Sequence, residues 1–295
     1  MKYLAPLFLL LGIMSCEKNT AEQVKLDLQG HRGCRGLLPE NSIAGFIHAI
    51  DLGVATLEMD VVLDAENELI VSHEPFMSAE ICLMPNGDSI PDSAQYELNI
   101  YKMNYSEIMQ FDAGMKPHPR FTEQKKLPSY KPKLQAIMDT VEAYTAANNR
   151  QPIRYNIELK STTETDTVYH PIPSEFVQYV FEEIDSRVGW ERVTLQSFDF
   201  RVLQEIHQKY PDITLSLLIE NELPFQENLD SLGFTPDVYS CEFVLLSQSN
   251  VKDLQKQGIK VIPWTVNEVA DMQKLVEWGV DGLISDYPDR FKKIK

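Results

Sequence analysis

The sequence has little positive charge. Its 27 Lys and Arg residues stand against 44 Asp and Glu residues, and the formal net charge at pH 7 is -17. No basic cluster stands out along the chain, so we do not expect nucleic acid as a partner. An acidic protein repels anionic substrates at long range. A substrate that carries a phosphate would therefore need a metal or local basic side chains in its binding site.

Cysteine is scarce as well. The four cysteines are Cys16, Cys34, Cys82 and Cys241, and their wide spacing excludes the paired-Cys pattern of a zinc site. In an exported protein, two of the last three could form a disulfide, but the sequence does not indicate which two. The chain also has no G-x-G-x-x-G motif and no P-loop, so nothing in it supports nucleotide binding.

The chain begins with an apolar run that is too short to span a bilayer. Residues 1–15 carry one Lys and then this run, which is typical of a secretory signal. The end of the run, Ile13-Met14-Ser15-Cys16, resembles the lipobox of bacterial lipoproteins. That resemblance implies cleavage before Cys16 and lipid on its sulfur, which would anchor the protein to the bacterial cell envelope, on the periplasmic side or at the cell surface. An ordinary signal with a chance Cys is the alternative.

The rest of the chain is expected to be one folded domain over residues 25–295, after a polar tether over 16–24. With 43% hydrophobic residues, it is long enough to bury one large core. Eight short apolar runs predict strands, at 26–30, 56–63, 154–160, 193–197, 214–219, 238–241, 261–266 and 282–285. Candidate helices lie between most of them, at 42–52, 132–147, 174–185, 200–209, 246–257 and 269–278. Strands that alternate with helices over about 265 residues predict an α/β fold of the (β/α)8 TIM barrel type, with a doubly wound sheet as the alternative.

One connection breaks this alternation. After the second predicted strand, "ELIVSH" reads as a returning antiparallel strand. About 55 residues then pass before the next firm helix, and loops of that length are uncommon and often functional. We therefore expect an insertion over about 75–130, which lies over the barrel mouth and has short elements of its own.

Chemically active side chains recur where the predicted strands end. Glu58 and Asp60 are two residues apart in "TLEMDVVL", so on a strand they point to the same side. The others are two histidines, two basic residues and one more acid: His31, Arg32, His73, Glu158 and Lys160. The carboxyl ends of the strands form the catalytic face of a (β/α)8 barrel, so these side chains should meet there. Buried acidic pairs are costly without a cation or a hydrogen-bond partner.

An ordered set of motifs resembles the glycerophosphodiester phosphodiesterase family. From residue 30 to 288 the motifs are "GHRG", "PENS", "LEMDV", "VSHEP", "FDAG", "NIELK", "LQSFD", "PWTVN" and "VDGLISDYP". The resemblance implies a barrel of the phospholipase-C-like phosphodiesterase type. It also implies hydrolysis of glycerophosphodiesters to sn-glycerol 3-phosphate and an alcohol. The chain departs from the family pattern at Glu74, where an Asp usually follows the His, and in a longer segment between His73 and "FDAG".

The resemblance implies that Glu58, Asp60 and Glu158 hold one divalent cation. The ion would be Mg²⁺ or Ca²⁺, because carboxylate oxygens suit these hard ions. Three further residues stand nearby in the motifs. Glu40 is a second-shell contributor or a helix cap, Gln196 contributes to the site or to core packing, and Trp264 is a wall for the alcohol moiety or a core residue.

The same resemblance makes His31 and His73 the general acid and base, since histidine titrates nearest neutral pH. Arg32 and Lys160 would hold the phosphate oxygens and offset developing charge. A phospholipase-D-like lyase or a phosphoinositide-type phosphodiesterase on the same barrel is an alternative. A non-catalytic phosphodiester-binding lipoprotein is another, although the intact histidines and carboxylates argue against it.

Overall fold

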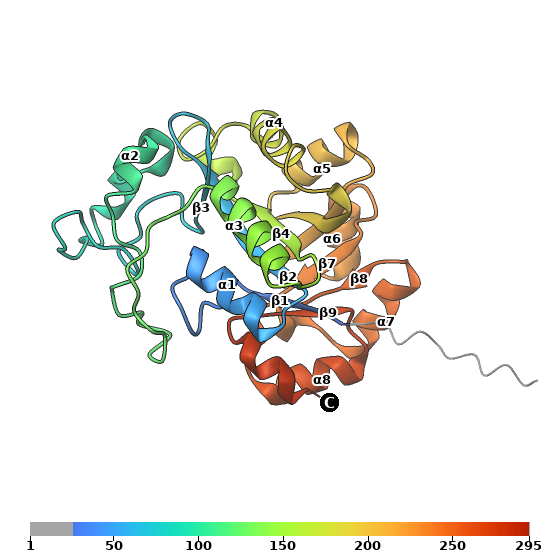
Figure 1. Ribbon diagram of the computed structural model, residues 1–295. Helices are drawn as coiled ribbons and strands as arrows, with labels where there is room; N and C mark the ends of the chain where they lie inside the picture. The colour runs from blue at the N-terminus through green and yellow to red at the C-terminus, as the bar shows by residue number, and fades with distance from the viewer. Residues whose placement is uncertain (1–25, 295) are drawn as a thin grey trace, which may run out of the picture.

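The computed structural model describes residues 26–294, which form a barrel of strands enclosed by helices (Figure 1). The strands are β1 Asp27–Gly30, β2 Thr56–Leu63, β3 Leu69–Val71, β4 Arg154–Leu159, β5 Val193–Ser197, β6 Thr214–Ile219, β7 Val238–Cys241, β8 Lys260–Val261 and β9 Gly282–Ser285. The α-helices are α1 Ile43–Leu52, α2 Tyr105–Ile108, α3 Leu134–Ala147, α4 Pro173–Ile184, α5 Phe200–Lys209, α6 Phe225–Leu232, α7 Gln248–Lys256 and α8 Val269–Trp278. The predicted signal, the tether and the lipidation site at Cys16 lie outside the described residues and stay predictions.

The eight parallel strands run round the barrel in the order β8-β7-β6-β5-β4-β2-β1-β9. Single backbone hydrogen bonds bridge the gap between the β8 and β9 segments. The Asp281 N–H donates to the Val261 carbonyl at 2.9 Å, and the Val266 N–H donates to the Ile284 carbonyl at 2.9 Å. The barrel is therefore nearly closed, and the prediction of a (β/α)8 barrel is confirmed. The returning strand β3 pairs antiparallel with β2, with Val71 opposite Val61.

Strand β8 is shorter than the predicted run over 261–266. Pro263 has no backbone N–H and so cannot donate to a ladder, which ends the regular strand early. The chain nevertheless continues beside β7, because the Trp264 N–H donates to the Cys241 carbonyl at 3.0 Å. This contact carries Trp264 along the barrel wall toward the mouth.

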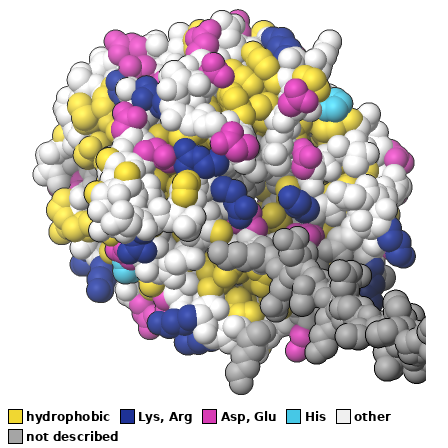
Figure 2. Space-filling model, turned by 45° about the vertical axis from the view of Figure 1, so that its right-hand side comes forward, with side chains coloured by type: hydrophobic (Ala, Val, Ile, Leu, Met, Phe, Trp, Pro, Cys, Tyr) yellow, Lys and Arg dark blue, Asp and Glu magenta, His cyan; other side chains and the backbone are white. Residues whose placement is uncertain are grey.

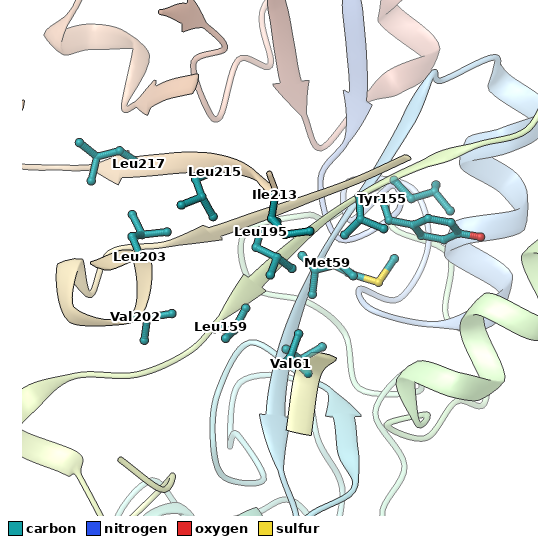
Figure 3. Packing of buried hydrophobic residues seen from close by; sticks show 14 of the residues in the cluster. Met59, Val61, Tyr155, Leu159, Leu195, Val202, Leu203, Ile213, Leu215 and Leu217 are labelled. Carbon is teal, nitrogen blue, oxygen red and sulfur yellow. The ribbon is translucent and has the colours of Figure 1, made fainter. Parts of the chain in front are cut away.

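The hydrophobic core lies between the barrel strands and the surrounding helices. Figure 3 shows part of it, where Met59, Leu195 and Leu215 from three strands lie among residues of α5 such as Leu203. Polar side chains face the barrel interior instead. The Asn156 amide on β4 donates to Gln29 Oε1 on β1 and to Gln196 Oε1 on β5, both at 2.9 Å. The interior is thus a hydrogen-bonded polar layer beneath the mouth, which is where a polar site can be built.

The insertion has a small core of its own. Met77, Cys82, Ile100 and Ile108 are fully buried in a second cluster that also contains Ile70 of β3. In Figure 1 this segment, coloured from cyan to green, extends from one side of the barrel.

Two features of the described residues bear on export and membranes. Cys34, Cys82 and Cys241 are all buried and free, so the structure contains none of the three pairings that the sequence left open. Within residues 26–294, no helix combines the length and the hydropathy that crossing a bilayer requires.

A first prediction concerns the core. Leu195→Ala should lower the free energy of unfolding by about 2–5 kcal/mol, because Leu195 is fully buried and its truncation leaves a cavity. Leu223 is 53% exposed, so Leu223→Ala should change the same quantity by less than about 0.5 kcal/mol. Urea unfolding of the three proteins measures both values. Equal losses in the two variants would contradict the placement of Leu195.

Candidate active site

Three carboxylates meet at the carboxyl ends of β2 and β4. Glu58 and Asp60 lie on β2, and the strand register places Asp60 directly opposite Glu158 of β4. One oxygen of each residue lies within 4.8 Å of the others, and all three side chains are buried. The Asp60 Oδ1 atom is buried and has no hydrogen-bond partner. These oxygens form a donor set that suits a hard divalent cation.

The charges of these carboxylates conflict with one another. Burial and the neighbouring Asp60 hold the pKa of Glu58 well above its usual range. Burial also raises the pKa of Glu158 to about 7, against the opposing charge of Lys160. Burial alone would raise the pKa of Asp60 too, but Arg32, His73, Lys160 and the Asn41 hydrogen bond together outweigh it and hold that pKa well below its usual range. Three like charges at this distance oppose full ionisation unless a cation lies between them. The residues present therefore fit a metal.

His31 follows β1 and is held by an acid from the other end of the chain. Its Nδ1 donates to Asp286 Oδ1 at 2.7 Å, because β1 and β9 are neighbours in the barrel. This bond leaves Nε2 facing the carboxylates, 3.9 Å from Glu58 Oε2. Burial and the charge of Arg35 lower the pKa of His31 to about 4, against the attraction of Asp286. His31 is therefore neutral at pH 7, with Nε2 free to accept a proton.

Arg35 secures the same acid. Its guanidinium donates to both oxygens of Asp286, at 2.8 and 3.3 Å. The Asn267 amide donates to Asp286 Oδ2 at 2.8 Å. Burial alone would raise the pKa of Asp286, but the contacts with His31 and Arg35 hold it well below its usual range. Asp286 is thus an ionised residue that orients His31.

His73 stands on the loop after β3. Its Nδ1 bonds to Glu74 Oε1 at 2.7 Å, so Glu74 takes the orienting role for this ring. Burial, followed by the charges of Arg32 and Lys160, lowers the pKa of His73. The loop itself is held by the buried Lys131, whose Nζ donates to Ser72 Oγ at 2.6 Å.

Two cations face the carboxylates. Lys160 Nζ lies 2.8 Å from Glu158 Oε1, and Arg32 Nε lies 3.3 Å from Asp60 Oδ2. Arg32 adopts a left-handed backbone conformation with φ 48°, which is unusual for a residue other than glycine. In this conformation its backbone N–H donates to Glu58 Oε2 at 2.8 Å. Buried guanidinium and ammonium groups in this position suit phosphate oxygens.

Glu40 neither joins the carboxylate group nor caps a helix. Its Oε1 accepts from Arg32 Nη1 at 3.0 Å, while the side chain of Ser42 caps α1 by accepting from the Gly45 N–H at 3.0 Å. The helix-cap interpretation of Glu40 is therefore wrong. Burial would raise the pKa of Glu40, but Arg32 and Arg35 outweigh it and lower the pKa to about 2.

A cavity of about 550 Å³ is lined by both histidines, both cations and two of the three carboxylates, namely His31, His73, Arg32, Lys160, Glu58 and Glu158. Gln196 reaches the carboxylates directly, because its amide donates to Glu58 Oε1 at 2.9 Å. Trp264 forms part of an apolar wall with Phe198, whose ring lies edge-to-face at 5.5 Å. Glu40 is not among the residues that line this cavity. The structure thus brings together every predicted site residue that it describes, with Glu40 one contact further out.

Three supporting residues were not among the predicted site residues. Asp286 lies in the motif "VDGLISDYP", directly after the last strand. Arg35 and Asn41 had not been considered, and Asn41 donates to Asp60 Oδ2 at 2.9 Å. A signal existed for Asp286, since an acid after the last strand lies beside the histidine after the first in a closed barrel. No local pattern pointed to the other two.

Comparison with known proteins agrees with this geometry. The model of the "Glycerophosphoryl diester phosphodiesterase family" matches residues 31–290. The chain belongs to the glycerophosphoryl diester phosphodiesterase family. A glycerophosphodiester phosphodiesterase of Caldanaerobacter subterraneus subsp. tengcongensis is 26% identical over 265 residues, which cover 88% of this chain and 93% of that protein.

Solved structures of the glycerophosphodiester phosphodiesterase type share the fold. One from Silicibacter pomeroyi has a TM-score of 0.81 and 26% identity, and the match covers 92% of this chain and 93% of the other. An Oleispira antarctica phosphodiesterase, solved in complex with the product sn-glycerol-3-phosphate, has a TM-score of 0.70 and 22% identity, with 90% and 95% covered.

A second prediction tests the ion pair beneath His31. Asp286→Asn leaves the buried Arg35 without its close anion, so the free energy of unfolding at pH 7 should fall by about 3 kcal/mol. The folded state lowers the pKa of Asp286, so its stabilisation is complete above the unfolded pKa of about 3.9 and is lost as the pH falls below that value.

Urea unfolding of wild type and variant from pH 7 to pH 3 measures this difference, which should shrink at acid pH. Asp212→Asn is the matched control, because Asp212 is an exposed carboxylate on the connection after α5. A difference that stays constant or grows toward pH 3 would rule out the ion pair as its source.

Proposed function

We propose that this protein hydrolyses glycerophosphodiesters to sn-glycerol 3-phosphate and an alcohol, with a divalent cation and two histidines. The observation that carries the proposal is the composition of one cavity. It combines a carboxylate group that fits a metal, two cations and two histidines, each oriented by its own acid. Family membership and the product seen in the Oleispira antarctica relative support the same reaction.

Glu58, Asp60 and Glu158 would hold the metal. When bound, a divalent cation of the Mg²⁺ or Ca²⁺ type supplies Lewis-acid stabilisation of charge on phosphate oxygens. The chain's own cations act on the same group. Arg32 and Lys160 lie beside the carboxylates, so they hold the phosphate oxygens and offset the negative charge that develops as the diester is attacked.

The histidines move the protons. With Nδ1 of each ring bonded to a carboxylate, Nε2 is the atom that remains for the substrate. One Nε2 takes a proton from the attacking hydroxyl, and the other returns a proton to the leaving alkoxide. The attacking hydroxyl belongs to water or to the glycerol moiety. We also propose that lipid on Cys16 anchors the protein to the cell envelope. Only the sequence motif at residues 13–16 supports this location.

Mass-spectrometric product analysis tests the proposed reaction. Glycerophosphocholine, glycerophosphoethanolamine and glycerophosphoglycerol should each yield sn-glycerol 3-phosphate, and EDTA should abolish the yield. Phosphocholine and glycerol as products would show cleavage on the wrong side of the phosphate. Turnover of lysophosphatidylcholine alone would favour the phospholipase-D-like alternative, and no turnover of any diester would favour a binding protein.

A third prediction concerns the metal. Excess Mg²⁺ or Ca²⁺ should raise the Tm of wild type, by an amount that corresponds to about 2.7 kcal/mol at 100 times Kd. Asp60→Asn removes one anionic ligand, so the increase in Tm should be much smaller. Asp212→Asn is the control, because Asp212 is exposed and belongs to neither group of clustered acids. An unchanged increase in Asp60→Asn, or full activity after exhaustive chelation, would refute the metal site.

A fourth prediction assigns the histidines. His31→Ala and His73→Ala should each lower kcat by about 10²–10⁴-fold on glycerophosphocholine, because each removes a proton-transfer group. A p-nitrophenyl diester has a good leaving group and barely needs a general acid, so it should restore turnover only to the variant that lacks the acid. His48→Ala, on α1 and away from the cavity, should keep wild-type turnover. Wild-type rates in both active-site variants would eliminate this mechanism.

A further inference from the structure

The exposed hydrophobic side chains belong to connections on one side of the barrel. Scattered surface hydrophobics are normal, but their distribution here is not. Among the described residues, the nine large hydrophobics that are markedly exposed lie in the insertion between β3 and α3, which includes α2, or in the connections β4–α4, β6–α6 and β7–α7. They are Tyr96, Met109, Met115, Leu127, Tyr130, Val168, Ile172, Leu223 and Val244. Connections that run from a barrel strand to the next helix lie on the catalytic side of a (β/α)8 barrel, and the insertion is part of the connection from β2 to α3. We refer to these nine residues as the apolar rim.

The insertion adds local positive charge to this rim. Residues 115–133 contain six Lys or Arg residues and one Glu, in a chain whose net charge is -17. Four of the six are occupied by contacts within the protein, among them Lys116, whose Nζ donates to the Ala79 carbonyl. Lys131 is buried on Ser72, Arg120 pairs with Glu80, and Lys133 pairs with Glu68.

Two of these cations remain at the surface. Lys125 and Lys126 are exposed, and neither forms a salt bridge within the described residues. They stand directly before the exposed Leu127, with the exposed Tyr130 three residues further on. On the face in Figure 2, acidic side chains are interspersed with Lys and Arg. Lys125 and Lys126 therefore offer two cations, unpaired within residues 26–294, for an anionic surface beside the exposed Leu127 and Tyr130.

We propose that the apolar rim and Lys125–Lys126 dock the catalytic mouth on a lipid bilayer that contains anionic lipids. Leucine and methionine side chains gain from burial among acyl chains, and tyrosine favours the headgroup level. Lysines beside them attract anionic headgroups. The arrangement orients the barrel mouth toward the membrane, where phosphodiesters with long alcohol moieties reside. Docking itself does not depend on the proposed reaction.

Other occupants fit less well. Nucleic acid needs a wider basic surface than two free lysines, and the overall charge opposes it. A second copy of this chain would bring an equal net charge of -17 against the first. A bilayer accepts separate protruding side chains on several loops, since it has no fixed shape to match.

Vesicle flotation tests the proposal with a chain that begins at Ala21, which removes any lipid anchor. Every described strand and helix lies after that residue, and β1 starts at Asp27, so this chain keeps the whole barrel. We expect binding to phosphatidylcholine vesicles with 30% phosphatidylglycerol (about this share gives a strong surface charge) and weaker binding to pure phosphatidylcholine. Salt should weaken the first interaction by screening.

Two variants and one control separate the contributions. Lys125→Glu/Lys126→Glu should lower partitioning into anionic vesicles about tenfold or more, and Leu127→Ser/Tyr130→Ser should lower it on both vesicle types. Lys256→Glu/Lys260→Glu makes the same charge change at the amino end of β8, on the opposite side of the barrel, and should bind as wild type does. Unchanged Tm and unchanged kcat on soluble glycerophosphocholine would show that each variant is folded.

The proposal would be overturned by absent vesicle binding in wild type, or by equal losses in the control and the rim variants. Size-exclusion chromatography covers the alternative of a second copy. A dimer that dissociates on Leu127→Ser/Tyr130→Ser, together with no vesicle binding, would assign the rim to self-association instead.

Discussion

The mutual repulsion of three buried carboxylates is the constraint on which the site depends. Strand β2 places Glu58 and Asp60 on one side, and the parallel register with β4 brings Glu158 opposite Asp60. None of these backbone positions can relax without breaking the barrel ladder. The surrounding residues offset part of this repulsion. Each of four residues donates a hydrogen bond or places a cation on one of the three acids: Arg32, Asn41, Lys160 and Gln196. A divalent cation is the group that would let all three ionise together.

The two histidines are held by different means. His31 depends on barrel closure, because its acid Asp286 follows β9 and the backbones of the two strands meet where the His31 N–H donates to the Ser285 carbonyl at 2.9 Å. His73 depends on the insertion, because Lys131 anchors Ser72 at the end of that segment. Glu74, a departure from the usual Asp of the family, still reaches Nδ1 of its neighbour. The longer carboxylate therefore keeps the orienting bond.

The insertion connects the site to the molecular surface. Its own buried cluster keeps it folded against β3, and its basic half carries the exposed Leu127 and Tyr130. His73, its anchor Lys131 and five of the nine rim residues thus belong to one segment between β3 and α3. The proposed docking at the rim and the position of His73 would therefore share one scaffold.

The sequence by itself determined most strand positions and the side of the strand on which Glu58 and Asp60 lie. Bounds for β2, β5, β6, β7 and β9 follow from apolar runs, and the two-residue period of a strand is enough to put Glu58 beside Asp60. Family motifs supplied the roles. Two predictions were wrong where a local preference decides the structure. Pro263 cannot donate to a strand ladder, so β8 ends before it, and the serine hydroxyl of Ser42, not Glu40, caps α1.

Only the tertiary structure decided which distant groups meet. Asp286 and His31 are 255 residues apart in the chain, and they touch because the first and last strands are neighbours in a barrel that closes. The pairing of Glu40 with Arg32, the support from Arg35 and the exposure of the rim depend equally on side-chain packing in three dimensions. Hydrophobic periodicity describes the environment along one element and carries no information on its partners. Contacts between elements arise from register, closure and burial, which the whole fold sets at once.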